Sequence, residues 1–178
     1  MTLLCTKRLF LRQWRKEDKE KLAKLHADEE VMRYFPYRLT EEESDRWVES
    51  CREHIAQHQF GIWAVERMHT GEFIGCIGLN ATTEKMPFPL SMELLWRFDL
   101  RFMTKDFAME AALEVLDYAF SELSLPRVIA YVSTHNSSSI ALMRSIGMRD
   151  CQQNFLHPAL PADHELAEHV LYEIRAPH

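Results

Sequence analysis

Apolar positions recur along the chain with two different spacings, and these predict a mixture of strands and helices. In residues 7–13, Leu9 and Leu11 fall on one side of an alternation, as in a strand that is buried on one face. Helical spacing predicts five helices, at 16–26, 29–34, 40–58, 107–123 and 137–146. Runs rich in β-branched and aromatic residues predict six further strands, at 60–66, 73–79, 91–98, 128–133, 149–155 and 169–174.

Residues with specific backbone roles mark several of these boundaries. Thr40 and Glu43 have the spacing of a capping box, in which each side chain accepts a backbone N–H of the other at the start of a helix. Pro36 ends the short helix before it, and Gly147 stops the last helix. Residues 68–71 suit the loop of a hairpin between two strands.

The composition favours one folded domain that spans residues 1–178. The 178 residues, 47% hydrophobic and 11% aromatic, can bury a core, and they contain no internal repeat. The formal net charge of −6 disfavours general nucleic-acid binding. No apolar run reaches the roughly 20 residues that cross a membrane, and the N-terminal segment lacks the pattern of a secretory signal. Four widely spaced cysteines fit reduced thiols, so we expect a cytoplasmic protein without membrane or nucleic-acid partners.

Several common catalytic patterns are absent from the sequence. There is no glycine-rich phosphate loop ending in Lys-Ser or Lys-Thr and no Gly-x-Gly-x-x-Gly motif, which disfavours nucleotide kinases and dinucleotide-dependent oxidoreductases. His54 and His58 lie one helical turn apart, but no third ligand accompanies them. His157, His164 and His169 are irregularly spaced. We therefore expect solvated, loop or strand histidines rather than a metal site.

Two segments place a helix N-terminus directly after a strand. Residues 92–111 run from a strand through a loop into a helix, whose first backbone N–H groups and positive dipole end can bind an anion such as a pyrophosphate. In residues 136–148, Asn136 or Ser137 caps a helix and offers an amide or a hydroxyl group to a ligand. The alternative interpretation is that both segments are ordinary helix caps.

Taken together, five parts of the chain resemble the GNAT acetyltransferases, and in particular the alanine N-acetyltransferases that modify ribosomal-protein N-termini. The matching parts are 6–14 (TKRLFLRQW), 31–36 (VMRYFP), 60–66 (FGIWAVE), 136–148 (NSSSIALMRSIGM) and the stretch from 157–158 through 169–172. The resemblance implies the GNAT α/β fold, with a single mixed, mostly antiparallel sheet of about seven strands flanked by helices and splayed between the fourth strand, 91–98, and the fifth, 128–133. It also implies acetyl-CoA in the gap as cosubstrate, no metal, and a small-molecule amine or a peptide N-terminus as the acceptor.

The resemblance also assigns roles to individual residues. Glu93 is the expected base that takes the proton of the amine, and Ser139 and Tyr131 are hydroxyl groups near the expected CoA thiolate. Asn136 is expected to hold the pantetheine arm or a catalytic water. The residues expected to bind the cofactor are Trp96, Arg97, Phe98, Met103, Thr104, Lys105, Asp106, Phe107, Ala108, Asn136 and Ser139. The alternatives are an exposed strand carboxylate for Glu93, a first-turn helix position for Ser139 and a core position for Tyr131.

Two residues depart from the family pattern. Asp106 stands where the family has the central glycine of its pyrophosphate loop. Its side chain fills space, can cap the following helix, and would repel a phosphate charge about 5 Å away by roughly 3 kcal/mol at an effective dielectric of about 20. Leu95 replaces a glycine within the fourth strand and is expected to narrow the channel. Two hypotheses follow: an acetyl-CoA-dependent N-acetyltransferase, or a GNAT-fold binding or regulatory protein with impaired acetyl-CoA binding.

Overall fold

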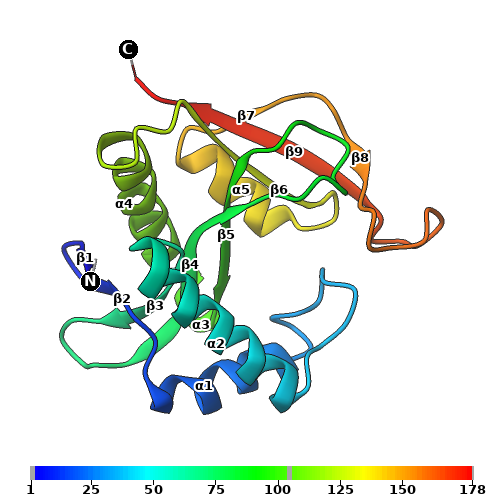
Figure 1. Ribbon diagram of the computed structural model, residues 1–178. Helices are drawn as coiled ribbons and strands as arrows, with labels where there is room; N and C mark the ends of the chain where they lie inside the picture. Colours follow the sequence, from blue (N-terminus) through cyan, green and yellow to red (C-terminus); the bar gives the residue numbers. More distant parts are fainter. Residues whose placement is uncertain (1–2, 104–105, 178) are drawn as a thin grey trace.

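The computed structural model describes residues 3–103 and 106–177, which form one twisted sheet flanked by helices (Figure 1). The sheet has nine strands in the order β1-β2-β3-β4-β5-β6-β9-β7, with β8 paired to β9. The strands are β1 Leu4–Cys5, β2 Leu9–Arg12, β3 Ile62–Arg67, β4 Phe73–Ala81, β5 Met92–Phe98, β6 Arg127–Ser133, β7 Arg149–Asp150, β8 Phe155–Leu156 and β9 Glu168–Arg175. The helices are α1 Lys16–Ala27, α2 Glu41–His58, α3 Leu100–Met103, α4 Phe107–Ser121 and α5 Ser137–Ser145.

The sheet parts between β5 and β6, its one parallel pair in the described part of the chain. Glu93 lies opposite Ile129, and no further register pair joins the described residues of these strands. By contrast, β6 pairs antiparallel with β9 along all of 127–133. The predicted splay between the fourth and fifth of the predicted strands is therefore confirmed, and it opens on the C-terminal side of Glu93.

Adjacent side chains of β5 show which helices cover which face, because successive residues of a strand point to opposite sides. The Arg97 side chain contacts His26 of α1 and the Trp47 ring of α2. The neighbouring Trp96 donates a hydrogen bond to Ser139 at the start of α5. The α1–α2 layer and α5 therefore lie on opposite faces of the sheet, as their positions in Figure 1 also indicate.

Several predicted boundaries are confirmed in detail. At the start of α2, the Thr40 hydroxyl accepts the Glu43 backbone N–H at 3.2 Å, and the Glu43 carboxylate accepts the Thr40 N–H at 2.9 Å. The capping box therefore forms as predicted, and α2 ends at His58. Asn136, rather than Ser137, occupies the N-cap of α5, since its Oδ1 accepts the Ser139 backbone N–H.

The helix predicted at 29–34 is wrong, because these residues form turns. After Met32 donates to the Asp28 carbonyl oxygen, the next backbone bonds, from Arg33 to Glu30 and from Phe35 to Met32, span only three residues, so the segment forms turns rather than a regular helix. The strand predicted at 149–155 is instead divided into β7 and β8, and β1 and α3 were not predicted. These elements are two to four residues long, too short to leave a periodic signal.

None of the helices formed by the described residues has the length and apolar character needed to cross a membrane. All four cysteines carry free thiols, and Cys51 and Cys76 are buried. Burial raises the pKa of the Cys76 thiol to about 12, so this group is neutral at physiological pH.

Candidate active site

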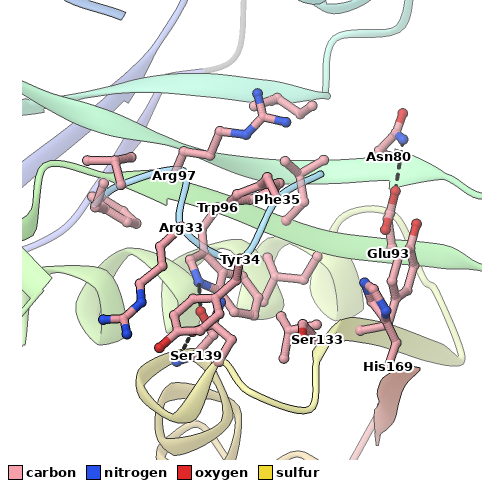
Figure 2. Close-up of a pocket in the computed structure, with 18 of the residues that line it drawn as sticks. Arg33, Tyr34, Phe35, Asn80, Glu93, Trp96, Arg97, Ser133, Ser139 and His169 are labelled. Carbon is pink, nitrogen blue, oxygen red and sulfur yellow. Dashed lines mark hydrogen bonds between the residues drawn. The ribbon is translucent and has the colours of Figure 1, made fainter. Parts of the chain in front are cut away.

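A cavity of about 790 Å³ lies where β5 and β6 separate, between the sheet, the segment that joins α1 to α2, and the start of α5 (Figure 2). Most of the predicted site residues that the structure describes lie on its wall. These are Glu93, Trp96, Arg97, Phe98, Met103, Tyr131, Asn136 and Ser139. The cavity thus joins the predicted catalytic residues with most of the predicted cofactor contacts.

Glu93 is a buried carboxylate at the point where the two strands part. Its side-chain oxygen accepts a hydrogen bond from Asn80 Nδ2 at 3.0 Å, across the β4–β5 pair (Figure 2). Burial raises the pKa of Glu93, and hydrogen bonds from Asn80 and Tyr131 oppose this rise by stabilising the ionised form. The alternative of an exposed strand carboxylate is therefore wrong for Glu93, which is 9% exposed.

Tyr131 on β6 lies within a cluster of aromatic rings beside Glu93. Its ring centroid is 5.9 Å from Phe88, 5.7 Å from Phe155 and 5.9 Å from His157. Burial, together with the charge of Glu93, raises the pKa of the Tyr131 hydroxyl, which therefore stays protonated. The residue packs in this cluster and also lines the cavity, so the packing and functional interpretations of Tyr131 are compatible.

His169 is a cavity residue whose role the irregular histidine spacing did not indicate. Its Nδ1 lies 3.0 Å from the Ala167 carbonyl oxygen, which can only accept, so the neutral ring carries its proton on Nδ1 and leaves Nε2 as an acceptor. Burial lowers the pKa of His169. The His157 ring lies tilted against it, with the ring centroids 4.9 Å apart, and burial also lowers the pKa of His157. The described residues contain no group of three His, Cys, Asp or Glu side chains that could hold a metal ion.

The start of α5 brings three predicted residues together on the other side of the sheet. The Trp96 indole N–H donates to Ser139 Oγ at 3.2 Å, and the Ser139 backbone N–H donates to Asn136 Oδ1 at 3.2 Å. Ser139 is buried and stands in the first turn of α5, as its alternative interpretation also required. Because the Trp96 N–H donates a hydrogen bond to the serine oxygen, the serine O–H remains available to donate a hydrogen bond to another group.

The loop before α4 differs from its prediction at one residue. Asp106 is exposed, has φ 60° and makes no side-chain hydrogen bond to the helix that it precedes, so the expected cap by its carboxylate is wrong. A positive φ is the conformation that glycine adopts readily and aspartate tolerates, so the backbone shape suited to glycine is kept. Phe107 and Ala108 are buried, and Thr104 and Lys105 lie outside the described residues.

Leu95 and Arg97 share the face of β5 that carries Glu93. Leu95 lies opposite Gly78 in the β4–β5 pair and lines the cavity. Arg97 is directed away from Ser139 and ends beside Phe35 (Figure 2). Its Nη1 lies 2.6 Å from His26 Nε2. The side chain predicted to contact the cofactor is therefore on the α1–α2 side of the sheet.

Sequence reasoning missed most of the residues that surround Arg97 and Glu93. His26, Trp47 and Asn80 come from three separate segments. Only His26 left a usable signal, because it follows Leu22 by four residues and so shares the buried face of α1.

The sheet parts beside a buried carboxylate, and a large cavity lies at the gap, as the acetyltransferase fold predicts. The family model described as acetyltransferase (GNAT) domain matches residues 8–149, and the chain belongs to this family. It is an N-acetyltransferase, and acetyl-CoA is the acetyl donor that the family uses.

Comparison with individual proteins gives the same family. The chain is 34% identical to the uncharacterized N-acetyltransferase YoaA of Bacillus subtilis (strain 168) over 155 residues. The aligned part covers 83% of this chain and 82% of that protein. The structure is similar to a crystal structure of a GNAT-family acetyltransferase from Bacillus anthracis, with a TM-score of 0.81 and 26% identity over 98% of each chain. A ribosomal-protein-S5-alanine acetyltransferase from Vibrio fischeri superposes with a TM-score of 0.76 over 98% of this chain and 97% of that one, but at 16% identity it shows the fold alone.

Proposed function

We propose that this protein transfers an acetyl group from acetyl-CoA directly to a primary amine, either a peptide N-terminus or a small molecule. The observation that carries the proposal is the position of Glu93, a buried carboxylate at the parting of β5 and β6 and on the wall of the cavity. A carboxylate whose pKa burial raises is a better proton acceptor near neutral pH than an exposed one.

The reaction needs no covalent enzyme intermediate. Glu93, directly or through a water, takes the proton of the ammonium, and the free amine attacks the thioester carbonyl. The carbon–sulfur bond then breaks, the CoA thiolate leaves with the bonding pair, and the nitrogen of the product amide releases its extra proton to the thiolate or to solvent. The hydroxyl of Ser139 or Tyr131 supplies a proton or a hydrogen bond to this thiolate, while a backbone N–H of β5 polarises the carbonyl oxygen.

The acetyl-CoA side of the proposal uses the gap and the two helix starts. Residues 96–98 form no register pair with β6. The edge of β5 that faces the gap is therefore suited to pairing with an extended pantetheine arm. Met103 and Asn136 line the cavity, and the backbone of 106–108 offers the first N–H groups of α4 to the pyrophosphate. The proposal does not depend on the side chain of Arg97.

The narrower resemblance to alanine N-acetyltransferases for ribosomal proteins favours a protein N-terminus as the acceptor. We keep it as a proposal, together with one domain over residues 1–178 and a cytoplasmic location. A small amine remains the alternative acceptor, since the cavity wall contains both charged and aromatic side chains.

The role of Glu93 is tested by Glu93→Gln with Asn80→Ala as the matched variant. Glu93→Gln should lower kcat/KM by roughly 10²- to 10⁴-fold while leaving acetyl-CoA affinity unchanged. In the native enzyme, kcat/KM should rise with pH as Glu93 ionises. Asn80→Ala removes a hydrogen bond to the ionised form, so it should move this rise to higher pH. Native activity in Glu93→Gln would contradict the proposal.

Calorimetric titration of acetyl-CoA into the native protein and into Asp106→Gly tests the cofactor side. Micromolar binding by the native protein supports the transferase, with a modest gain in the variant because a negative charge is removed. Binding by the variant alone would instead favour the regulatory alternative. No binding by either protein would contradict acetyl-CoA as the donor.

A further inference from the structure

Arg97 is a cation inside the cavity wall for which the described part of the chain supplies no counterion. Its Nη1 bonds to His26, whereas Nε is buried without a hydrogen-bond partner. No carboxylate among residues 3–103 and 106–177 forms an ion pair with it. Removing a guanidinium from water is costly unless an anion compensates it, so the arrangement is incomplete as it stands.

The groups around Arg97 cannot supply the missing charge. His26 is fully buried, and burial followed by the charge of Arg97 lowers its pKa to about 3, so its ring is neutral at physiological pH. Its Nδ1 faces the Ser44 hydroxyl at 2.8 Å, and the remaining Nε2 accepts from Arg97. The thiols of Cys51 and Cys76 are also kept neutral by burial. The charge of Glu93 raises the pKa of Arg97, but Glu93 forms no ion pair with it, so no described residue neutralises the guanidinium by direct contact.

Two aromatic rings hold the guanidinium in place. Its central carbon lies 5.1 Å from the Phe35 ring centroid and 4.9 Å from that of Trp47. Together with the bond to His26, these contacts fix the orientation of the planar group. Nη1 is engaged and Nε is buried, so Nη2 forms the remaining edge that can donate a hydrogen bond to a carboxylate.

The position of this edge relative to Glu93 suggests which molecule brings the carboxylate. Glu93, Leu95 and Arg97 lie on one face of β5, and all three line the cavity. The Cα atoms of Glu93 and Arg97 are about 13 Å apart at 3.3 Å per residue. An amine that reaches Glu93 would pass over the apolar Leu95 before its far end meets Arg97.

We infer that Arg97 binds a carboxylate of the acceptor, so that the preferred acceptors are amines that carry an acidic group at the far end of an apolar spacer. This inference rests on the proposed function and adds the class of acceptor to it. It also assigns Phe35 and Trp47 as positioning residues that hold the guanidinium ready.

The experiment compares pairs of acceptors that differ only in charge. A series of ω-amino acids with four to eight carbons is assayed against the corresponding carboxamides, by release of free CoA. Peptides with a second-residue Asp or Glu are assayed against those with Asn or Gln, which separates a peptide acceptor from a small molecule. The native enzyme should prefer the carboxylate member of the best pair by about 10- to 100-fold in kcat/KM, mostly through KM.

Variants then assign this preference to Arg97. Arg97→Gln should reduce the ratio of kcat/KM for the carboxylate to kcat/KM for the amide to about one, because only the carboxylate loses a charged partner. Arg97→Lys should give an intermediate ratio, because it keeps the charge but not the planar guanidinium that His26, Phe35 and Trp47 hold. Arg52→Gln, which removes an exposed cation on α2, is the control for net charge and should leave the ratio unchanged.

The possible results distinguish a failure of this inference from a failure of the proposed function. Equal rates for carboxylates and amides in the native enzyme, or an undiminished preference in Arg97→Gln, would overturn the inference while leaving acetyl transfer intact. A purely structural role for Arg97 would lower the rates for both members of a pair equally, which would also overturn it. If no amine of any kind is acetylated although acetyl-CoA binds, the proposed function itself fails.

Discussion

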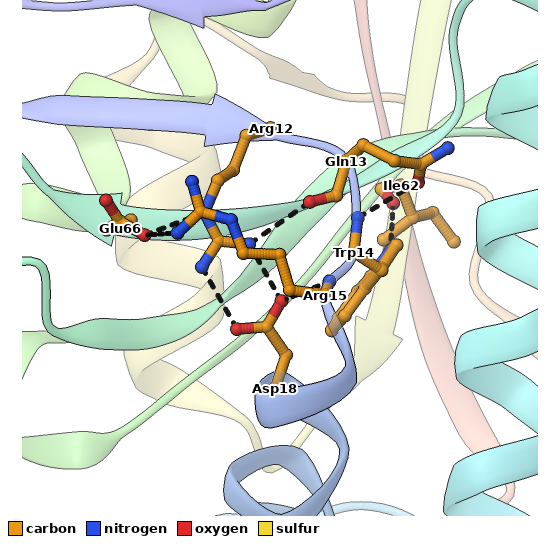
Figure 3. Close-up of polar contacts among 7 residues, drawn as sticks. All are labelled: Arg12, Gln13, Trp14, Arg15, Asp18, Ile62 and Glu66. Atoms are coloured by element: carbon orange, nitrogen blue, oxygen red, sulfur yellow. Dashed lines mark hydrogen bonds and ion pairs between the residues drawn. The ribbon is translucent and has the colours of Figure 1, made fainter.

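Two arginines of this protein, Arg12 and Arg97, are removed from solvent in opposite ways. Arg12 at the end of β2 donates to Asp18 through Nη1 and Nη2, at 2.7 and 3.0 Å, and to Glu66 through Nε at 2.7 Å (Figure 3). Asp18 also accepts the backbone N–H of Arg15, whose side chain reaches the same Glu66. Nη1 also donates to the Gln13 carbonyl oxygen at 3.1 Å, so each nitrogen of the Arg12 guanidinium has a partner within the protein.

The electrostatic consequences differ accordingly. Burial lowers the pKa of Arg12, but hydrogen bonds from its guanidinium to Asp18 and Glu66 outweigh that and raise it. Burial also lowers the pKa of Arg97, and no carboxylate bond reverses this. The Arg12 cluster joins β2 to α1 and β3, and is complete without a ligand. The Arg97 site is rigid but unpaired, and this contrast separates an arginine that supports the fold from one that awaits an anion.

The largest effect is expected from Asp18→Ala. This change leaves the buried Arg12 cation with one carboxylate fewer and removes the hydrogen-bond acceptor at the start of α1, so the free energy of unfolding should fall by roughly 3 kcal/mol. Urea denaturation measures it. Glu49→Ala, at a half-exposed ion pair on α2, should change stability by less than about 1 kcal/mol. Equal losses in the two variants would show that the Arg12 cluster is not a special support.

An intermediate effect is expected from His26→Gln, and it depends on pH. The pKa of His26 is about 3 in the folded protein and near 6.5 when unfolded, so between these values only the unfolded state takes up the proton. Native stability should therefore fall as pH drops below 6.5. His26→Gln cannot titrate, so from pH 7 to 5.5 it should lose about 1 kcal/mol less than the native protein.

The shifted pKa values of His54, His157 and His169 act in the same direction, but these residues remain in the variant, so the difference isolates His26. Parallel pH dependence of the two proteins would mean that His26 is already charged in the folded state. That result would remove the neutral partner of Arg97.

The smallest effect on stability is expected from Arg97→Leu. The change removes a buried cation that has no counterion, so the desolvation cost that disappears offsets the lost contacts with His26, Phe35 and Trp47. The free energy of unfolding should stay within about 1 kcal/mol of the native value in urea denaturation. A loss as large as that of Asp18→Ala would make Arg97 a structural residue like Arg12.

Features that depend on neighbouring residues were predictable. The capping box of Thr40 and Glu43 and the cap by Asn136 involve residues three apart, so their spacing alone indicates them. The helix predicted at 29–34 is wrong for a related reason, since helical spacing over six residues does not show that the backbone bonds there span three residues rather than four. Likewise, the sequence placed Asp106 at the start of a helix but could not give its positive φ.

The sequence by itself determined the alternation of strands and helices, the resemblance to the acetyltransferase family, and Glu93 as a candidate base. Only the tertiary structure decided that Glu93 is buried at the parting of two strands, that Arg12 meets two carboxylates, and that Arg97 meets none. The physical reason is that the cost of a buried charge depends on the groups within a few ångströms of it. These groups come from segments as far apart as residues 12 and 66, or 26 and 97, and their meeting is set by packing rather than by local spacing.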